Sequence, residues 1–263
     1  MSATDGDDAR RANGKGPAAT APHPVLTRYY ASELERRRFV TALFDGGARH
    51  YDRVCGVMSL GSGRLYRRDV LSRAGLARGM RMLDVATGTG LVAREAVALL
   101  GDARAVVGLD PSAGMLREAR RALAAPLVQG RAEELPLVSG QFDVVSIGYA
   151  LRHVADLGVA FRECLRVLKP GGRLLVLEIT RPRSAVGRGL VRLYFQAVLP
   201  LLMRVSTGSA EAGLLTRYYW DTIDECVPPD TIMGVMRASG FAGVERRVLG
   251  GLLSEYVARK PAG

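Results

Sequence analysis

One short segment constrains the fold of this chain more than any other part of the sequence. An apolar run at 80–85 leads into a loop that contains Gly88 and Gly90, and apolar residues then recur with helical spacing over 91–100. A second apolar run follows at 105–109. A strand that enters a helix through a glycine-containing turn and returns as a second strand is typical of a parallel β–α–β unit.

The loop and the two strand ends predict a nucleoside site for a ligand that carries positive charge. Gly88 and Gly90 let the backbone adopt positive φ and approach a ligand closely. Asp110, after the second apolar run, can accept hydrogen bonds from both ribose hydroxyls. The third glycine of a dinucleotide fingerprint is replaced by Ala93, and Asp84 adds a negative charge that disfavours a pyrophosphate. S-adenosylmethionine (SAM), with its sulfonium and amino groups, therefore fits better than NAD.

Strand-like and helix-like segments alternate through the middle of the chain. Helices are expected at 111–124, 159–168 and 231–239, and strands at 127–129, 142–147, 173–179, 241–249 and 254–258. This alternation favours an α/β fold with a doubly wound, Rossmann-like parallel sheet, whose ligands bind at the carboxyl ends of the strands. The last two strands are expected to pair antiparallel.

Length and composition predict one globular domain after a short tail. The chain has 263 residues, of which 48% are hydrophobic, enough for one α/β core. Residues 1–24 hold few large apolar side chains, so we expect a disordered tail there and a single domain at 25–263. Neither a signal peptide nor a run of roughly 20 apolar residues is evident, which predicts a cytoplasmic protein. Three scattered cysteines fit no metal-ligand pattern, so no metal is expected.

The net charge of +11 comes mainly from short arginine runs that are dispersed along the chain. Such charge attracts nucleic acid or anionic lipid, but its dispersal favours solvated helix faces. RNA or DNA methylation is one alternative function. The sequence has no Asn-Pro-Pro-Tyr or Asp-Pro-Pro-Tyr segment and no Pro-Cys nucleophile loop, so no nucleic-acid partner is expected.

Two apolar segments outside the predicted sheet, at 39–71 and 186–222, are expected to cover the open site as helical caps. The second contains an apolar stripe at helical spacing between Leu190 and Leu202. A stripe of this kind is more often part of a core than a contact with a prenyl tail or a membrane surface, and we expect core here. Peripheral membrane contact and homo-oligomerisation both stay open.

Several motifs in a fixed order carry a family resemblance. They are Phe44-Asp45, Tyr51-Asp52, Ser59-Leu60-Gly61 and the segments 83–90, 150–154 and 166–172. This set resembles the ubiquinone/menaquinone biosynthesis C-methyltransferases, which are class I SAM-dependent methyltransferases, over about residues 40–260. The resemblance implies a seven-stranded sheet with the last strand antiparallel, SAM as methyl donor with S-adenosylhomocysteine as product, and a small aromatic or quinol acceptor such as a prenylated quinone precursor.

The same resemblance, carried over residue by residue, implies a cofactor site at the carboxyl ends of the strands. The methionine moiety would contact Asp84, Gly88, Thr89 and Gly90, the ribose Asp110, and the adenine Met115, Arg131 and Ala132. Arg131 departs from the Asn or Asp usual in relatives, so Ala132 would act there through its backbone. Gly148 and Tyr66 stand where relatives often have Ser and Trp.

Arg152 is the candidate that the resemblance places closest to the methyl acceptor. Because a guanidinium stays protonated in proteins, we expect Arg152 to stabilise a phenolate or orient a water rather than act as a base. The structural alternative is an ion pair with Asp156 or Glu178. Tyr51 and Tyr149 would orient a quinol oxygen or form an aromatic wall.

His153 replaces the Asn that usually follows this arginine in relatives. An imidazole has an ordinary pKa suited to proton transfer near neutrality. If His153 accepts a hydroxyl proton, O-methylation of a small molecule in specialised metabolism becomes the alternative reaction. A partly buried structural histidine is an equally good explanation.

Overall fold

Seven strands form one sheet in the computed structural model, which describes residues 19–208 and 210–263. Their order is β3-β2-β1-β4-β5-β7-β6, and all neighbours pair parallel except the two pairs that involve β7. The strands are β1 (Met82–Val85), β2 (Val106–Asp110), β3 (Leu127–Gln129), β4 (Phe142–Gly148), β5 (Leu168–Ile179), β6 (Ala242–Leu249) and β7 (Leu253–Arg259). The predicted mainly parallel sheet with an antiparallel last strand is confirmed.

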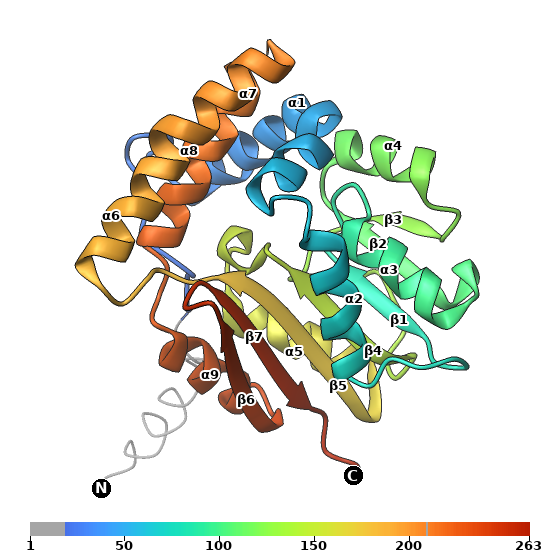
Figure 1. Cartoon of the computed structure of the whole chain (residues 1–263). Helices are drawn as coiled ribbons and strands as arrows, with labels where there is room; N and C mark the ends of the chain where they lie inside the picture. The colour runs from blue at the N-terminus through green and yellow to red at the C-terminus, as the bar shows by residue number, and fades with distance from the viewer. Residues whose placement is uncertain (1–18, 209) are drawn as a thin grey trace, which may run out of the picture.

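Helices cover both faces of this sheet and the carboxyl ends of its strands (Figure 1). They are α1 (Glu33–Met58), α2 (Gly63–Arg73), α3 (Leu91–Leu100), α4 (Ala113–Ala122), α5 (Leu157–Val167), α6 (Ala185–Leu193), α7 (Leu199–Thr207), α8 (Ala210–Asp224) and α9 (Pro229–Ala238), with short turns η1 (Ala103–Ala105), η2 (Leu151–His153) and η3 (Tyr194–Val198). Helices α2 and α3 pack on one face, and α5 and α9 on the other. Helices α1, α6, α7 and α8 gather above the carboxyl ends of the strands, and we call this group the cap.

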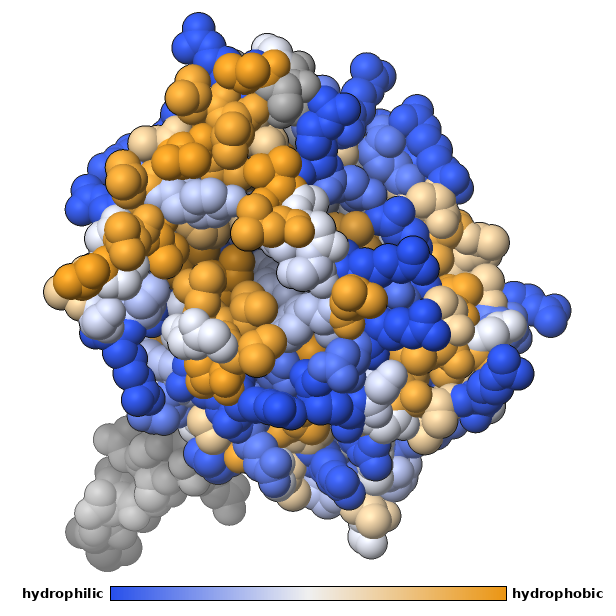
Figure 2. Space-filling model, in the orientation of Figure 1, coloured by the Kyte–Doolittle hydropathy of each residue, from blue (hydrophilic) through white to orange (hydrophobic). Residues whose placement is uncertain are grey.

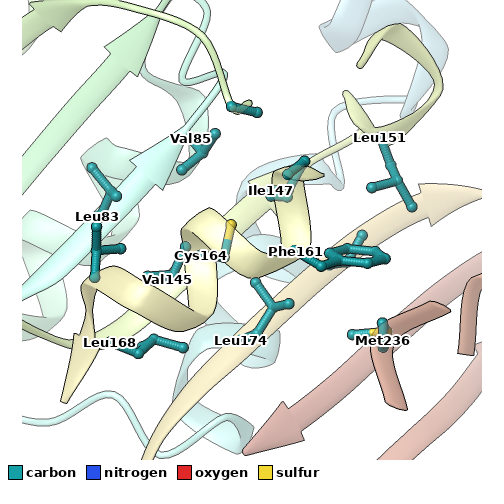
Figure 3. Packing of buried hydrophobic residues seen from close by; sticks show 14 of the residues in the cluster. Leu83, Val85, Val145, Ile147, Leu151, Phe161, Cys164, Leu168, Leu174 and Met236 are labelled. Atoms are coloured by element: carbon teal, nitrogen blue, oxygen red, sulfur yellow. The ribbon is translucent and has the colours of Figure 1, made fainter. Parts of the chain in front are cut away.

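Alternation along the strands divides the core into two layers. In β1, Leu83 and Val85 belong to the layer under α5, whereas Met82 belongs to the layer under α2 and α3. Figure 3 shows the first layer, in which Phe161 and Cys164 of α5 lie against the strands. All four residues of β1 are buried, as expected for a parallel strand covered on both faces.

Strand β5 begins five residues earlier than the sequence pattern predicts. The motif Lys169-Pro170-Gly171-Gly172 was expected to end a helix before a strand at 173–179, but α5 already ends at Val167 and the strand begins at Leu168. Leu168 pairs with Phe142, and the Gly171 N–H donates to the Lys260 carbonyl at 3.1 Å. The irregular register beside β4 lets this glycine-rich segment join the sheet.

The first cap segment, predicted at 39–71, divides into two parts with different roles. Helix α1 contacts α4 and α8 above the strands. Helix α2 instead packs against the sheet, where Val70 and Leu71 share a cluster with Met82. The expectation of a cover over the site therefore fits α1 and does not fit α2.

The second cap segment contains one continuous helical stretch, formed by α6, η3 and α7. Pro200 lacks the N–H that an α-helix needs, and the π-turn η3 precedes it, with the Leu199 N–H donating to the Tyr194 carbonyl. Phe195, Leu199 and Met203 are buried, but other apolar side chains of the stripe are exposed. The expectation that the stripe is core is therefore wrong for Leu190, Leu193, Val198, Leu201 and Leu202.

The predicted tail at 1–24 lies mostly outside the described residues, since the structure describes the chain from residue 19. Residues 19–24 pack against the domain. The Thr20 carbonyl accepts from the Leu157 N–H at 2.9 Å, and the Pro22 carbonyl accepts from the Val227 N–H at 2.8 Å. His23 is only 2% exposed. These six residues therefore behave as part of the domain.

Candidate active site

Asp84 lies near the end of β1, in the middle of the sheet, and is 1% exposed. The register places it between Gly108 of β2 and Ser146 of β4. The Thr87 hydroxyl donates to its Oδ2 at 2.7 Å, and the Ser146 hydroxyl donates to its Oδ1 at 2.5 Å. Burial raises the pKa of the Asp84 carboxyl to about 6, although these hydrogen bonds oppose the shift. A buried acid of this kind favours a cationic ligand group.

The loop after β1 has three residues with positive φ: Ala86, Gly88 and Gly90. Ala86 is the unusual one, because a residue with a side chain disfavours this conformation and keeps it mainly at functional sites. Gly90 is the residue just before α3, and a Cβ at this position would lie only 3.2 Å from the Leu123 side chain. The loop thus carries backbone N–H groups to the amino end of α3, a position that suits a negatively charged ligand group.

Asp110 ends β2 and is 6% exposed. Its Oδ2 accepts from the Gly88 N–H and its Oδ1 from the Ser112 N–H, both at 2.8 Å. Each carboxylate oxygen keeps a second acceptor position, so the side chain can still bind two hydroxyls. Burial raises the pKa of the Asp110 carboxyl to about 6 as well.

The three residues predicted beside the adenine divide between two places. Arg131 and Ala132 line a small pocket with a volume of about 80 Å³, together with Ala86 and Leu109. The Arg131 Nε lies 3.5 Å from the Glu133 carboxylate. Met115 is buried in α4 and is not among the residues that line this pocket.

Two aspartates of α1 join the cap to the predicted cofactor loops, and sequence reasoning assigned them no role. The Asp45 Oδ1 accepts from the Ser112 hydroxyl at 2.5 Å and from the Gly114 N–H at 2.7 Å. Asp52 accepts from the Thr89 hydroxyl at 2.5 Å and from Arg94 at 2.7 Å. Both residues stand in the motifs quoted above, and their seven-residue spacing, two helical turns, indicated one common face of α1.

Arg152 is 1% exposed in η2 and makes the ion pair that was its structural alternative. Its Nε donates to the Glu178 carboxylate at 2.8 Å. The two terminal nitrogens donate to the carbonyls of Tyr219 and Tyr149 and to the Thr222 hydroxyl, at 3.0–3.3 Å. Asp156, the other partner considered, instead caps α5. Four hydrogen bonds thus engage a guanidinium group that has five N–H donors.

His153 stands in an aromatic box formed by Phe44, Tyr218 and Tyr219. Its ring stacks on the two tyrosines, with centroids 5.6 and 6.2 Å apart, and meets Phe44 edge-on at 5.2 Å. Within the described residues, neither ring nitrogen has a hydrogen-bond partner. Burial, with the charge of Arg152, lowers the pKa of His153 well below its usual value. The imidazole is therefore neutral near pH 7 and a weaker base than an ordinary histidine.

Tyr51 connects the aromatic box with the glycine loop. Its ring carbon Cε1 lies 3.9 Å from the point that a Cβ of Gly88 would occupy, and its ring lies 6.2 Å from that of Phe44. Tyr149 follows β4 with a φ of +61°, and its N–H donates to the Leu177 carbonyl at 2.7 Å. Burial raises the pKa of both phenols, so both are neutral hydrogen-bonding groups.

Comparison with known proteins finds a family model and relatives that cover most of this chain. The model of the ubiE/COQ5 methyltransferase family matches residues 31–260. The ubiquinone/menaquinone biosynthesis C-methyltransferase UbiE of Shewanella sediminis is 36% identical over 225 residues, covering 82% of this chain and 88% of the relative. The demethylmenaquinone methyltransferase of Mycolicibacterium paratuberculosis is 35% identical over 236 residues, covering 88% of this chain and 98% of the relative.

A search of solved structures finds the same fold. The crystal structure of a SAM-dependent methyltransferase from Thermotoga maritima superposes with a TM-score of 0.59 at 20% identity, covering 83% of this chain and 98% of that one. At this identity the likeness supports the fold alone.

Proposed function

The chain belongs to the ubiE/COQ5 methyltransferase family and is a SAM-dependent methyltransferase, and on this premise we propose that it methylates a ring carbon of a prenylated quinol. The names of the relatives above support a quinone precursor as the acceptor. The observation that carries the proposal is the position of Tyr51 between the aromatic box and the glycine loop. Its ring lies 6.2 Å from that of Phe44, and its Cε1 lies 3.9 Å from the point that a Cβ of Gly88 would occupy. Aromatic side chains at this position suit an acceptor with a flat ring.

The hydrogen-bonding groups of these loops fit SAM. We assign the methionine ammonium to the Asp84 carboxylate, the ribose hydroxyls to Asp110, and the methionine carboxylate to the Thr89 N–H and the amino end of α3. The Gly88 and Gly90 N–H groups hold the loop in shape, since they donate to Asp110 and to the Thr87 carbonyl. Thr89 is held by Asp52 and positions this loop. We keep Arg131 and Ala132 as the wall of the adenine pocket. The Met115 N–H donates to the Ser112 hydroxyl, which caps the amino end of α4. SAM, when bound, supplies an electrophilic methyl group.

Ring-carbon methylation requires an electron-rich ring, which a quinol gains when a hydroxyl loses its proton. The protein contributes position and exclusion of water, so that the acceptor carbon faces the donor without competing hydrolysis. The charge of the buried Arg152 is paired with Glu178, and its bonds to the Tyr149 and Tyr219 carbonyls hold the aromatic walls. Arg152 then acts as a positioning group.

The O-methyltransferase alternative needs His153 as a base, and two observations weigh against it. The depressed pKa of His153 reduces its strength as a proton acceptor, and both of its ring nitrogens are buried. Family membership also favours carbon as the acceptor atom.

The acceptor class is tested by offering SAM with a radiolabelled methyl group together with a demethylated prenyl quinol, a soluble phenol or tRNA. We expect the label mainly in the prenyl quinol, less in the soluble phenol and none in tRNA. Label in tRNA would overturn the proposal, and a preference for the soluble phenol would remove the prenyl group from it.

We further propose a cytoplasmic enzyme with one domain over 25–263 that reaches its acceptor at a membrane surface. The buried contacts of residues 19–24 extend the proposed domain by a few residues. Homo-oligomerisation stays a prediction.

A further inference from the structure

The helical segment Ala185–Val205 has one face turned toward the protein and one turned toward solvent. Phe195, Leu199 and Met203 are at most 2% exposed and join the cap cluster with α8. The opposite side, which we call the outer face, consists of seven aliphatic side chains that are 41–80% exposed: Val186, Leu190, Leu193, Val198, Leu201, Leu202 and Val205. Figure 2 shows this apolar surface over α6 and α7, at the upper left. Isolated exposed apolar residues are ordinary, but a contiguous row marks an interaction surface.

Positive charge accompanies the outer face. Residues 179–210 contain five arginines and no acidic residue: Arg181, Arg183, Arg188, Arg192 and Arg204. Arg181 and Arg188 share Asp224 of α8 as an ion-pair partner. Arg183 and Arg204 have no ion pair within the part of the chain that the structure describes. Unneutralised arginines beside an apolar row suit a partner that is anionic at its surface and apolar below it.

A wide groove adjoins the outer face and is also lined by arginines and apolar side chains. Its volume is about 1260 Å³, and it lies between α6, the turn that joins β6 to β7, and the segment before α9. Four of the five arginines line it, together with Arg246 of β6. Ile179, Leu190 and Leu252 supply apolar lining between them. An anionic lipid headgroup with the start of its acyl chain matches cationic rims and an apolar lining.

We propose that the outer face docks on an anionic lipid bilayer, with Ala185–Val205 lying parallel to the membrane plane and the groove facing the headgroups. By length and composition this segment could cross a membrane. Its inner face is already packed against protein, and Arg188 and Arg192 interrupt the apolar sequence, so it fits the interface rather than the bilayer core. The docked surface lies on the cap, whose helix α8 also carries Tyr218 and Tyr219 of the aromatic box.

Charge decides between a bilayer and a second copy of this chain. A two-fold dimer through the outer face would bring the same arginines of both copies together. An anionic bilayer instead complements them and accepts the aliphatic side chains between its headgroups. The proposal does not depend on which acceptor the enzyme methylates.

Vesicle cosedimentation with the full chain tests the proposal. We expect the protein to pellet with vesicles of phosphatidylcholine mixed with phosphatidylglycerol, and to remain in solution with phosphatidylcholine alone. High salt should weaken the binding, since it screens exposed charge. The apolar variant Leu190→Glu/Leu201→Glu and the charge variant Arg183→Glu/Arg204→Glu should each bind at least about tenfold more weakly.

Two matched variants control for general effects of surface mutation. Val138→Glu changes an aliphatic residue that is 69% exposed outside the cap, and Arg120→Glu removes an exposed arginine of α4. Both should bind vesicles as the wild-type protein does. Calorimetric SAM binding, expected to be unchanged in all four variants, checks folding and keeps this test separate from the proposed function.

Three results would overturn the proposal. One is a wild-type protein that does not bind anionic vesicles. Another is equal vesicle binding by the outer-face variants and the controls. The third is a loss of self-association in the Leu190→Glu/Leu201→Glu variant, by analytical ultracentrifugation, with vesicle binding unchanged, which would assign the face to a second copy. Vesicle binding without SAM binding would sustain this inference and contradict the proposed function.

Discussion

Two buried carboxylates, Asp84 and Asp110, set the character of the proposed cofactor site at the scale of single residues. Each has a pKa raised to about 6 by burial, so at neutral pH each holds a charge that the protein alone stabilises poorly. An aspartate whose pKa is higher in the folded than in the unfolded chain stabilises the fold at low pH. That contribution is lost as the pH rises from about 4, the unfolded value, through about 6.

Replacement of Asp84 by Asn should therefore separate stability from binding. We expect Asp84→Asn to raise the free energy of unfolding of the ligand-free protein at pH 7.5, since it removes the buried charge. This effect should be ~1–3 kcal/mol more stabilising at pH 7.5 than at pH 4.5. Its affinity for SAM should fall at least about tenfold, because a charge-assisted contact is lost. Thermal unfolding at the two pH values and calorimetry measure both effects. Asp102→Asn, at an exposed turn, is the control, and unchanged SAM affinity in Asp84→Asn would contradict the assignment.

His153 should act as a wall of the aromatic box. Substitution by Asn should change the rate of methylation by less than about tenfold, whereas loss of a general base costs about 10²–10⁴-fold. At saturating SAM, the pH dependence of the rate should be the same in the wild type and in His153→Asn, since the pKa of His153 lies well below 6.5. Rates across pH 5.5–8 test this. A His153→Asn variant that binds SAM normally but turns over a hundred times more slowly would establish a base.

Helix α1 is the element that connects the cap with the proposed cofactor loops. Asp45 stabilises the amino end of α4 through Ser112 and Gly114. Its negative charge also interacts favourably with the helix dipole there. Asp52 holds Thr89 of the glycine loop. A Cβ at Gly114 would lie 2.8–2.9 Å from Asp45, so this close approach requires glycine.

Loss of the Asp45 contacts should loosen α1 over the site. We expect Asp45→Ala to destabilise the protein by ~0.5–2 kcal/mol and to raise the KM for SAM more than it lowers kcat. Amide hydrogen exchange should quicken in α1 and in the first turn of α4, while α5 stays protected. Glu118→Gln, which removes an ion pair on the exposed side of α4, should leave the KM and the exchange unchanged. Equal exchange in α1 of both variants would contradict this role for Asp45.

Sequence patterns predicted the helices and strands better than the contacts that these elements make. Periodicity indicated that the stripe from Leu190 to Leu202 has an apolar face, but a period carries no information on whether protein or solvent covers it. The early start of β5 at Leu168 depends on pairing with Phe142, a partner 26 residues away in the chain. Local turn signals at Gly171 and Gly172 could not reveal that pairing.

On the scale of the whole molecule, the ion pair between Arg152 and Glu178 joins the sheet to the cap. Glu178 belongs to β5, and Arg152 also bonds to the Tyr219 carbonyl and to Thr222 of α8. Alternation of strands and helices predicted the sheet, and strand ends predicted where Asp84 and Asp110 meet. Contacts between distant segments, such as Asp45 with Ser112, leave no local pattern and required the structure.

Removal of one partner of this buried pair should weaken the whole domain. We expect Arg152→Met to cost ~3–5 kcal/mol of unfolding free energy, since it leaves the Glu178 carboxylate buried without its cation. Arg152→Met/Glu178→Gln should recover part of that loss, as measured by urea denaturation. A single variant with wild-type stability and no methylation would instead assign Arg152 a purely chemical role.

We propose that the methyl group is transferred to a ring carbon of a prenyl quinol. Carbon-13 NMR of the product formed from a demethylated prenyl quinol and methyl-labelled SAM tests it most directly. We predict a single labelled methyl signal with direct coupling to a ring carbon, absent from the Asp84→Asn reaction at limiting SAM. A labelled methoxy signal, or no product from an enzyme that binds SAM, would contradict transfer to a ring carbon of this acceptor.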